Sequence, residues 1–571
     1  AFGIDNVGES KIFGLEFEGN DIETKHFDFI ESIFPIFDIS ADQIAPDFNK
    51  NRSPKHTRIF QSQEVDGYSV LLSQLQTKWF DGKLVLWGLD WWPDAHVPEG
   101  EILNDNQILE HAIEGVEFED FEVEWGDFAI LPDSYAEGEF RLVKVLNVNG
   151  KVDGLIRNYE TWVDAISGRV WFRQNKIVHH VGKKTVIPMG FIKPNKENEV
   201  KSNDLNSESA LEISANTPPV ISGQTNALAH AMYPYEDAEV LEMPHLRLEL
   251  DGDVYYSDEN GGFITNINQS LNNVPVSLEG RWCTLYTNGS TPSGNLNFNN
   301  GYNVLDIPGN TKEASAYRNT NLIHDHMNEW LPGFTDLDFS LTTNIDVDGE
   351  CNAFFDGVSI NFFDSGGGCN PTSLIADVVY HEYGHGINSY FYNSLGAGFY
   401  NGAMHEGYAD FWAMSLGDIA EIGKGFYTDN NDGIRVYDQD PKVYPEDIVG
   451  EVHADGEIIA GAWYDTHLLL GGDWNETLQL FVDAYPGLQA TAADGDEGQA
   501  FTDVLLDALQ ADDDDGDLMN GTPNAMEIIE GFDIHGISLF SYAEVEHTPM
   551  DFVAEETSIE INADVEIVFP Y

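Results

Sequence analysis

The chain is poor in basic side chains, with 27 Lys and Arg against 99 Asp and Glu and a formal net charge of -72. A surface of that sign repels the phosphate backbone of nucleic acids and the anionic face of a membrane, so both are disfavoured as partners. Long hydrophobic runs are also missing, and no stretch approaches the roughly 18 apolar residues that span a bilayer. The sequence therefore predicts neither a nucleic-acid-binding protein nor a membrane span.

Cysteine is scarce, with three residues at Cys283, Cys351 and Cys369. The last two bracket a segment of alternating apolar residues with a turn signal at Asp356-Gly357, which is typical of a hairpin with its open ends close together. We therefore expect a disulfide between Cys351 and Cys369, worth about 3 kcal/mol for a loop of that size. It would indicate an oxidising, extracellular setting. Three buried free thiols are the alternative.

The length of 571 residues, with 42% hydrophobic residues, suggests about four well-packed domains. Apolar alternation between turn signals predicts an α+β domain over 1–185, and a polar segment poor in aromatics predicts a linker over 186–219. Alternating runs between glycine turns predict a small β-rich domain over 220–300. Helical periods predict a largely helical domain over 301–540, and a C-terminal extension or the start of a further domain follows over 541–571. The predicted fold class is α+β multidomain.

An asparagine followed by a proline, Asn370-Pro371, is a typical helix start because one residue caps and the other fits the first helical position. The residues that follow place apolar side chains at helical spacing and run into VVYHEYGHGINSYF, residues 378–391. This segment holds two histidines four residues apart, with a glutamate directly after the first. The two histidines are therefore predicted to lie on one helix face.

Residues four apart on a helix have their Cβ atoms about 5 to 6 Å apart, so the imidazoles of His381 and His385 can bind one zinc ion. Glu382 lies beside that ion and is placed to take a proton from water. The next helical segment, NGAMHEGYADFWAMSLGD, offers Glu406 as a third ligand. Asp410, one turn later, can hold the distal nitrogen of a zinc-binding histidine. Elsewhere, two such acidic residues would simply indicate a solvated helix face.

HEYGHG followed by AMHEGYADFW resembles the zinc site of the fungalysin family of metallopeptidases and, more distantly, that of thermolysin. The resemblance implies a zinc endopeptidase that is secreted or at the cell surface, acts on protein or peptide substrates and has one catalytic zinc ion. It also implies a thermolysin-like catalytic domain with zinc-binding helices and a mainly helical C-terminal lobe. Residues 1 to about 180 resemble the mixed α/β propeptide of these enzymes, which would act as an intramolecular inhibitor.

The same resemblance assigns further residues. Asp377 matches a calcium-binding position, and Asn352 and Ala353 match the edge strand that holds the substrate backbone. Arg435, in GIRVYDQDP, matches an arginine that faces the substrate carbonyl, and His453, in EVHADGEIIAGAWYD, matches the histidine that stabilises the tetrahedral intermediate. Calcium is thus expected as a structural ion.

Two groups of the thermolysin pattern have no match at the same spacing. The candidates are Tyr390, Tyr392 and Tyr400 for the tyrosine that helps to hold the oxyanion, and Asp447, Glu451 and Asp455 for the carboxylate that orients the late histidine. A second calcium site in the acidic loop 511–517 is left open, because Ala511 occupies the first position of an EF-hand pattern.

Two other functions remain as alternatives. One is an aminopeptidase built on the same zinc site, which would need a group that binds a free N-terminus, and no motif provides one. The other is a surface binding or adhesion protein that keeps a peptidase fold without turnover. The presence of Glu382 and His453 favours the endopeptidase, since neither residue is needed to hold zinc.

Overall fold

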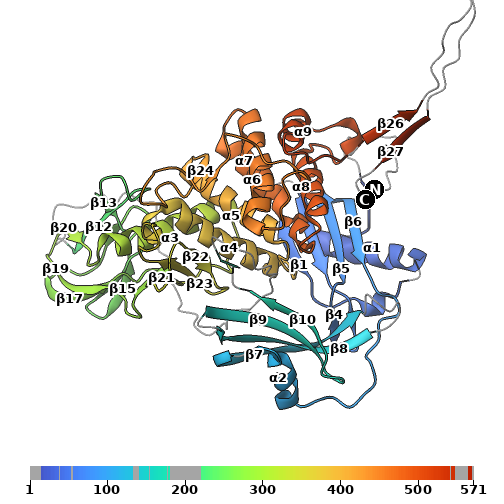
Figure 1. Cartoon of the computed structure of the whole chain (residues 1–571), viewed down its shortest axis with the longest axis horizontal. Coiled ribbons are helices and arrows are strands. Elements are labelled where there is room, and N and C mark those ends of the chain that lie inside the picture. The colour runs from blue at the N-terminus through green and yellow to red at the C-terminus, as the bar shows by residue number, and fades with distance from the viewer. Residues whose placement is uncertain are drawn as a thin grey trace, which may run out of the picture.

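The chain folds into nine described helices and several separate sheets, and is α+β in the computed structural model (Figure 1). The structure describes residues 14–37, 39–52, 56–116, 118–132, 140–152, 155–176, 178–179, 220–539, 542–546 and 564–568. The predicted linker over 186–219 lies outside these residues. Of the segment predicted over 541–571, the described part is an antiparallel strand pair, β26 (Tyr542–Glu546) with β27 (Asp564–Val568).

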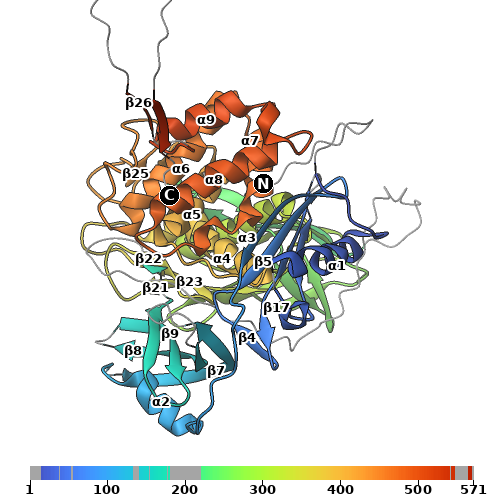
Figure 2. The ribbon, with the colours of Figure 1, turned by 90° about the vertical axis from the view of Figure 1, so that its right-hand side faces the viewer.

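The N-terminal part holds two helices, α1 (Ile22–Ile33) and α2 (Asp105–Ile113), and two sheets. The four-stranded sheet has the order β1 (Asn49–Arg52), β2 (His56–Gln61), β5 (Gln74–Phe80), β6 (Lys83–Asp90). The six-stranded sheet has the order β10 (Val170–Asn175), β9 (Leu155–Asp164), β8 (Phe140–Val152), β7 (Phe118–Pro132), β4 (Tyr68–Val70), β3 (Glu64–Val65). Figures 1 and 2 both show the sheet of β7, β8 and β9 below the helical lobe.

Three of the turns between these strands lie where the sequence predicts them, at the two Asp-Gly pairs and the Ser-Gly pair. Their glycines have positive φ, with 82° at Gly67, 76° at Gly82 and 77° at Gly168. Only glycine adopts that backbone region without a steric penalty, so these positions end one strand and start the next.

The region over 220–300 is rich in short strands, as predicted. Around β12 lie one parallel and two antiparallel neighbours, and two further strand pairs flank this sheet. The strands are β12 (Ser222–Ala229), β13 (Glu239–Glu242), β14 (Arg247–Leu250), β15 (Asp253–Tyr256), β16 (Gly262–Ile264), β17 (Leu271–Ser277), β19 (Ser293–Phe298) and β20 (Tyr302–Asp306). Their buried apolar side chains belong to the same cluster as those of the helical lobe, so the two regions share one core.

A five-stranded sheet joins three parts of the chain. Its order is β11 (Val178–His179), β22 (Ala353–Phe355), β23 (Ser359–Phe363), β21 (Leu341–Val347), β18 (Cys283–Thr287). The predicted hairpin is formed by β22 and β23, and the predicted disulfide between Cys351 and Cys369 closes its open end. Cys283 is buried on β18 as a free thiol.

The remaining helices form the lobe at the top of Figure 1 and the layer beneath it. They are α3 (Thr311–Trp330), α4 (Ala376–Ser394), α5 (Gly402–Gly417), α6 (Val452–Leu469), α7 (Trp474–Ala484), α8 (Glu497–Asp512) and α9 (Ala525–Asp533). One short strand pair, β24 (Glu421–Ile422) with β25 (Arg435–Val436), follows α5. Short 3-10 helices occupy Phe34–Phe37, Ala41–Gln43, Thr372–Leu374, Tyr485–Gly487, Gln489–Thr491 and Leu518–Asn520.

The helix start predicted at Asn370-Pro371 is wrong. The side-chain amide of Asn370 donates to the carbonyl oxygen of Gly425 at 2.8 Å, so it is held by a neighbouring loop and caps no helix. A 3-10 turn over Thr372–Leu374 follows, and α4 begins only at Ala376. A tertiary contact has overridden the local capping preference.

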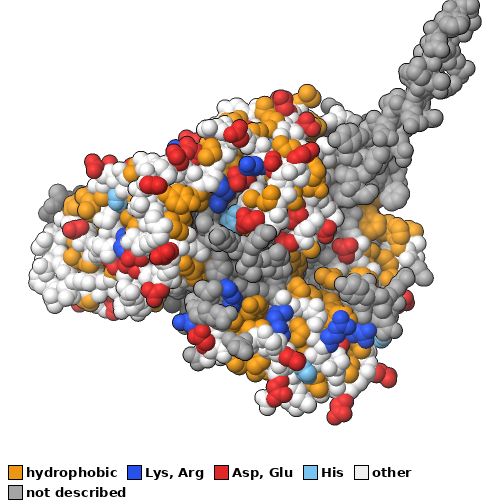
Figure 3. Space-filling view, in the orientation of Figure 1, with side chains coloured by type: hydrophobic (Ala, Val, Ile, Leu, Met, Phe, Trp, Pro, Cys, Tyr) orange, Lys and Arg blue, Asp and Glu red, His pale blue; other side chains and the backbone are white. Residues whose placement is uncertain are grey.

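The N-terminal part contacts the helical lobe through two buried basic side chains. Nη2 of Arg58, on β2, lies 2.7 Å from Oδ1 of Asp507 on α8. Nζ of Lys78, on β5, donates to Oε1 of Gln510 at 3.1 Å. In the face shown in Figure 3, acidic side chains are spread over the molecule, and Lys and Arg side chains gather mainly on the lower lobe. The buried ion pair of Arg58 and Asp507 thus joins the N-terminal part to α8.

Among the described residues, no helix combines the length and the hydrophobicity that crossing a membrane requires.

Candidate metal centre

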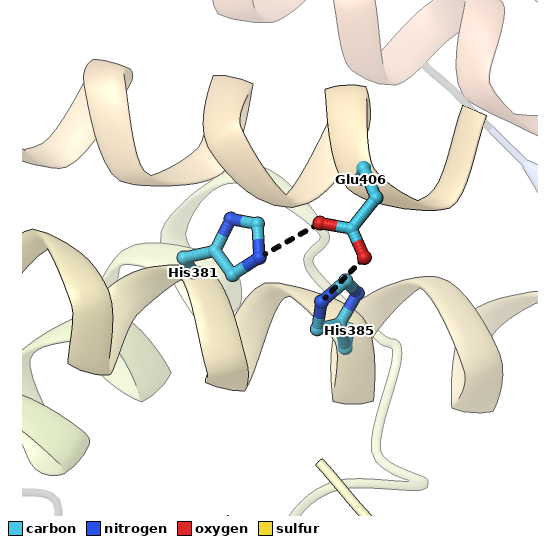
Figure 4. Close-up of side chains that lie close together, drawn as sticks. All are labelled: His381, His385 and Glu406. Atoms are coloured by element: carbon cyan, nitrogen blue, oxygen red, sulfur yellow. Dashed lines mark ion pairs between the residues drawn. The ribbon is translucent and has the colours of Figure 1, made fainter. Parts of the chain in front are cut away.

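Three predicted metal ligands converge between two packed helices. His381 and His385 lie one turn apart on α4, and Figure 4 shows their imidazoles beside the carboxylate of Glu406 on α5. Nε2 of His381 lies 3.2 Å from Oε2 of Glu406, and Nε2 of His385 lies 3.6 Å from Oε1. One ligand atom from each residue lies within 4.8 Å of the other two, and all three side chains are buried.

The close approach of α4 and α5 depends on a glycine between the two histidines. A Cβ atom added to Gly384 would lie 2.9 Å from the Cα atom of Ala409 on α5. That separation is shorter than a normal carbon-carbon contact, so any larger residue would push the helices apart. The absence of a side chain at Gly384 therefore brings Glu406 within reach of both histidines.

Asp410 holds the first histidine, as predicted. Its Oδ1 lies 2.5 Å from Nδ1 of His381, while Arg435 binds both carboxylate oxygens and the hydroxyl of Tyr437 donates to Oδ2. Burial disfavours a charged carboxylate, but Arg435 and His381 outweigh it and hold the pKa of Asp410 well below its usual range. Burial likewise opposes protonation of His381, but Asp410 and Glu406 raise its pKa to about 9.

Of the two further residues that contact Asp410, the sequence analysis named Arg435 but not Tyr437. The resemblance places Arg435 opposite a substrate carbonyl, and in the structure its guanidinium is 6% exposed and bound to Asp410. Its contact with substrate stays a prediction. Tyr437 was missed, although residues two apart on an extended segment share a side, and this alternation places it beside Arg435.

The second histidine has a partner that the sequence analysis also missed. Nδ1 of His385 lies 2.5 Å from Nδ1 of His405, and Nε2 of His405 lies 3.2 Å from the hydroxyl of Ser389. Both imidazoles are buried. The available signal was the histidine that directly precedes Glu406 in AMHEGYAD.

Glu382 is fully buried on α4 and is not one of the three converging ligands. Burial raises the pKa of its carboxyl to about 8, because an ionised carboxylate is poorly solvated there. A carboxyl group tuned toward neutral pH suits the transfer of a proton in either direction.

His453, on α6, lies near the carboxylate of Glu406. Its Nε2 lies 3.5 Å from Oε1 of Glu406, and its Nδ1 lies 2.6 Å from Oε1 of Glu451. Of the three candidates for the orienting carboxylate, Glu451 makes this contact. Asp455 instead accepts the backbone N–H groups of Val449 and Gly450.

The candidate tyrosines make other contacts. The hydroxyl of Tyr390 donates to the carbonyl oxygen of Gly357 at 3.3 Å, and that of Tyr392 donates to Oε1 of Gln489 at 3.1 Å. Tyr400 is half-buried, and loss of solvation raises the pKa of its hydroxyl above the usual value. None of these contacts joins a tyrosine to His381, His385 or Glu406.

The residues predicted to hold the substrate backbone lie at the start of β22, the second strand of the five-stranded sheet. Ala353 begins β22, and Oδ1 of Asn352 accepts the backbone N–H of Ala353 at 3.0 Å. The neighbour of β22 on its outer side is β11, which comes from the N-terminal part. Val178 pairs with Phe355, and His179 with Phe354, in antiparallel register.

The predicted calcium position is fully buried. Oδ1 of Asp377, in the first turn of α4, accepts the backbone N–H of Gly423 at 3.1 Å. Burial raises the pKa of Asp377 to about 7. In the described part of the chain, Asp377 belongs to no cluster of three potential ligands, whereas Asp513, Asp514 and Asp515 form one in the acidic loop.

The converging donors fit zinc. Two imidazole nitrogens and one carboxylate are a typical ligand set for a catalytic zinc ion, which keeps its fourth position open. The carboxylates of Glu382, Glu406 and Asp410 are all buried here, and Arg435 is the one guanidinium among them. Burial raises the pKa of Glu382 to about 8, and a bound divalent cation would favour its ionised form and offset that charge.

A scan against models of known protein families finds no match for this chain, and a search of curated proteins finds none either. Among solved structures, the C-terminal domain of YpeB from Bacillus megaterium is similar at 11% sequence identity, with a TM-score of 0.16. The alignment covers 29% of this chain and 69% of that chain. A TM-score this low supports no statement about fold or function.

Asp377→Asn should stabilise the fold in a pH-dependent manner. The carboxyl has a usual pKa of 3.8, raised to about 7 by burial, so its ionisation opposes folding. This cost in folding free energy is absent below pH 3.8, grows as the pH rises toward 7 and stays constant above pH 7. In the presence of a chelator, the free energy of unfolding of the variant should exceed that of the wild type by up to about 4 kcal/mol at pH 8 and by little at pH 4. Urea unfolding at both pH values measures this difference.

Calcium provides the second arm of this test. If calcium binds Asp377, as the resemblance implies, it should raise the melting temperature of the wild type and not that of Asp377→Asn. Asp514→Asn is the control for the acidic loop. An equal rise in all three chains, or in none, would exclude Asp377 as a calcium ligand.

Proposed function

We propose that the chain is a zinc-dependent endopeptidase of the fungalysin type, made as a precursor whose N-terminal domain inhibits it. The observation that carries the proposal is the convergence of His381, His385 and Glu406. Glu382 lies on α4 between the two histidines, and His453 faces the carboxylate of Glu406. We assign the two packed helices α4 and α5 and the adjoining sheet to a thermolysin-like catalytic domain. The disulfide that closes the open end of the β22–β23 hairpin favours secretion or a place at the cell surface.

His381, His385 and Glu406 would hold the zinc ion. When bound, zinc supplies a Lewis acid that acidifies water and polarises a carbonyl group. Glu382 takes the proton from the attacking water and later passes it to the leaving amine. Burial opposes protonation of His453, but Glu406 and Glu451 raise its pKa, which favours the imidazolium form. With Nδ1–H donating to Glu451, this form donates from Nε2 to the developing oxyanion. Hydrolysis then needs no covalent intermediate with the protein.

The non-catalytic alternative explains less of this arrangement. A protein that only binds zinc needs three ligands and the partners that orient them. It has no use for a fully buried glutamate directly after the first ligand, or for a histidine held by Glu451 at 3.5 Å from Glu406. Glu382 costs free energy to bury, and peptide hydrolysis gives both groups a purpose.

Inhibition by the N-terminal domain is supported by the pairing of β11 with β22. An extended peptide that adds to the edge of a sheet is a common mode of peptide recognition, with affinity from backbone hydrogen bonds. Here β11 takes that place with antiparallel register, next to Asn352 and Ala353. A substrate peptide that used the same edge would have to displace β11.

One experiment tests the zinc-dependent cleavage in this proposal. The chain is purified, its zinc content is measured, and its cleavage of a denatured protein is followed with and without a chelator. We expect about one zinc ion per chain and cleavage that stops on chelation and returns with added zinc. The proposal would be wrong if the chain binds no zinc, or if it still cleaves the denatured protein in the presence of the chelator.

Glu382→Gln should separate chemistry from metal binding. The amide cannot accept a proton, so turnover should fall by several orders of magnitude, while zinc content stays near that of the wild type because all three ligands remain. Metal analysis and peptidase assays measure the two effects. Glu497→Gln, at a buried glutamate that starts α8, is the matched control and should change neither. Equal loss of zinc in Glu382→Gln would mean that Glu382 is a ligand.

Cleavage of the chain between about residues 190 and 220 should activate it. The wild type and Glu382→Gln are incubated side by side and followed by mass and by peptidase activity, and any new N-terminus is sequenced. We expect the wild type alone to cut itself within the linker and gain activity. Full activity of the intact chain, or a cut elsewhere, would contradict activation by removal of the N-terminal domain.

The β11 strand can be tested without cleavage. His179→Pro removes a backbone N–H group from the strand that pairs with β22 and should weaken that pairing. The uncut variant should therefore be more active than the uncut wild type. Ser207→Pro, in the predicted linker, is the matched control and should leave the activity of the uncut chain unchanged.

A further inference from the structure

The two histidines of the candidate metal centre are held in different ways. Nδ1 of His381 contacts a carboxylate oxygen of Asp410, whereas Nδ1 of His385 contacts Nδ1 of another histidine, His405, at 2.5 Å. The rings of His385 and His405 have their centroids 4.6 Å apart and are tilted by 40°. His405 itself belongs neither to the three ligands nor to the catalytic groups proposed above.

The protons of this pair follow from the hydrogen-bond geometry. Two ring nitrogens at this distance share one proton, so one nitrogen donates and the other accepts. If Nε2 of His385 binds a metal ion, its Nδ1 carries the proton and donates to Nδ1 of His405. His405 then carries its own proton on Nε2, which lies 3.2 Å from the hydroxyl oxygen of Ser389 and donates to it.

The surroundings fix His405 in this orientation. Its backbone carbonyl accepts the side-chain amide of Asn388 at 3.0 Å, and the hydroxyl of Tyr485 donates to Oδ1 of the same asparagine. The ring of Phe399 packs edge-on against His405, with centroids 4.7 Å apart. Ser389 and Phe399 therefore contact the imidazole, and Asn388 holds the backbone of the same residue, while Nδ1 of the ring meets His385.

We infer that His405 is a positioning residue for the metal: it accepts the Nδ1 proton of His385 and thereby fixes the tautomer that presents Nε2 to zinc. The inference rests on the proposed zinc site and adds to it a neutral partner where the first histidine has a charged one. A partner of this kind fixes the orientation of the ligand ring and raises its basicity, and the loss of such a partner typically weakens metal binding about 10- to 100-fold.

The test compares two substitutions of nearly equal size. Asn places its Oδ1 at the same bond position as Nδ1 of histidine, and Leu places a methyl group there. Full-length chains that also carry Glu382→Gln, so that none can cut itself, are stripped of metal, and their zinc dissociation constants are measured by competition with a chelator. We expect His405→Leu to bind zinc about 10- to 100-fold more weakly and His405→Asn to recover most of that loss.

A second readout follows the geometry of the site. The visible absorption spectrum of the cobalt(II) form reports the ligand arrangement, and it should change in His405→Leu and stay close to that of the parent chain in His405→Asn. The control is His326→Leu, because His326 also bonds a serine hydroxyl, that of Ser415 at 2.9 Å, and packs against Trp412 rather than against a ligand. It should change neither the zinc affinity nor the spectrum.

Each outcome either supports or overturns the role of His405. Wild-type zinc affinity and an unchanged cobalt spectrum in His405→Leu would overturn the inference and leave the proposed function standing. A parent chain that binds no zinc would overturn both. If circular dichroism shows that His405→Leu is unfolded, Ser389→Ala decides, because it removes only the acceptor for Nε2 of His405. A few-fold weaker zinc affinity in that variant supports the inference, and an unchanged affinity overturns it.

Discussion

The burial of charge between α4 and α5 is the constraint on which the rest of the site depends. The carboxylates of Glu382, Glu406 and Asp410 are at most 2% exposed, and an ionised carboxylate without partners is very costly in a protein interior. Imidazoles from α4 and the guanidinium of Arg435 offset part of this charge. Burial raises the pKa of Glu382 to about 8, and a bound zinc ion would stabilise its ionised form. The groups proposed for the chemistry are therefore also the groups whose charges the fold has to balance.

Close helix packing makes this arrangement possible. Gly384 lets α4 approach Ala409, and a Cβ atom added to Gly407, on the other side of α5, would lie 2.6 Å from the carbonyl oxygen of Gly456 on α6. Three helices thus lie close enough for their short polar side chains to meet. The glycines carry no chemistry themselves, but any larger residue would separate the groups that do, because close-packed helices transmit such a displacement.

The N-terminal part is bound to the rest of the chain by contacts of two kinds. Arg58 forms a buried ion pair with Asp507, and β11 adds its backbone to β22. The ion pair requires a basic side chain opposite an acidic one, and this acidic chain has few basic side chains. The second needs only an extended backbone. In the proposed function, the first therefore anchors the N-terminal domain and the second blocks the sheet edge.

The sequence by itself determined what depends on spacing along the chain: two histidines one helical turn apart, the hairpin that its disulfide closes, and strand turns at glycines with positive φ. These features follow from local geometry, which neighbouring residues dictate. The tertiary structure decided which groups meet across elements. It paired His385 with His405, chose Glu451 for His453, and moved the start of α4 away from Asn370, whose side chain a loop 55 residues later holds. Such contacts depend on how helices and loops approach one another, and no local pattern carries that information.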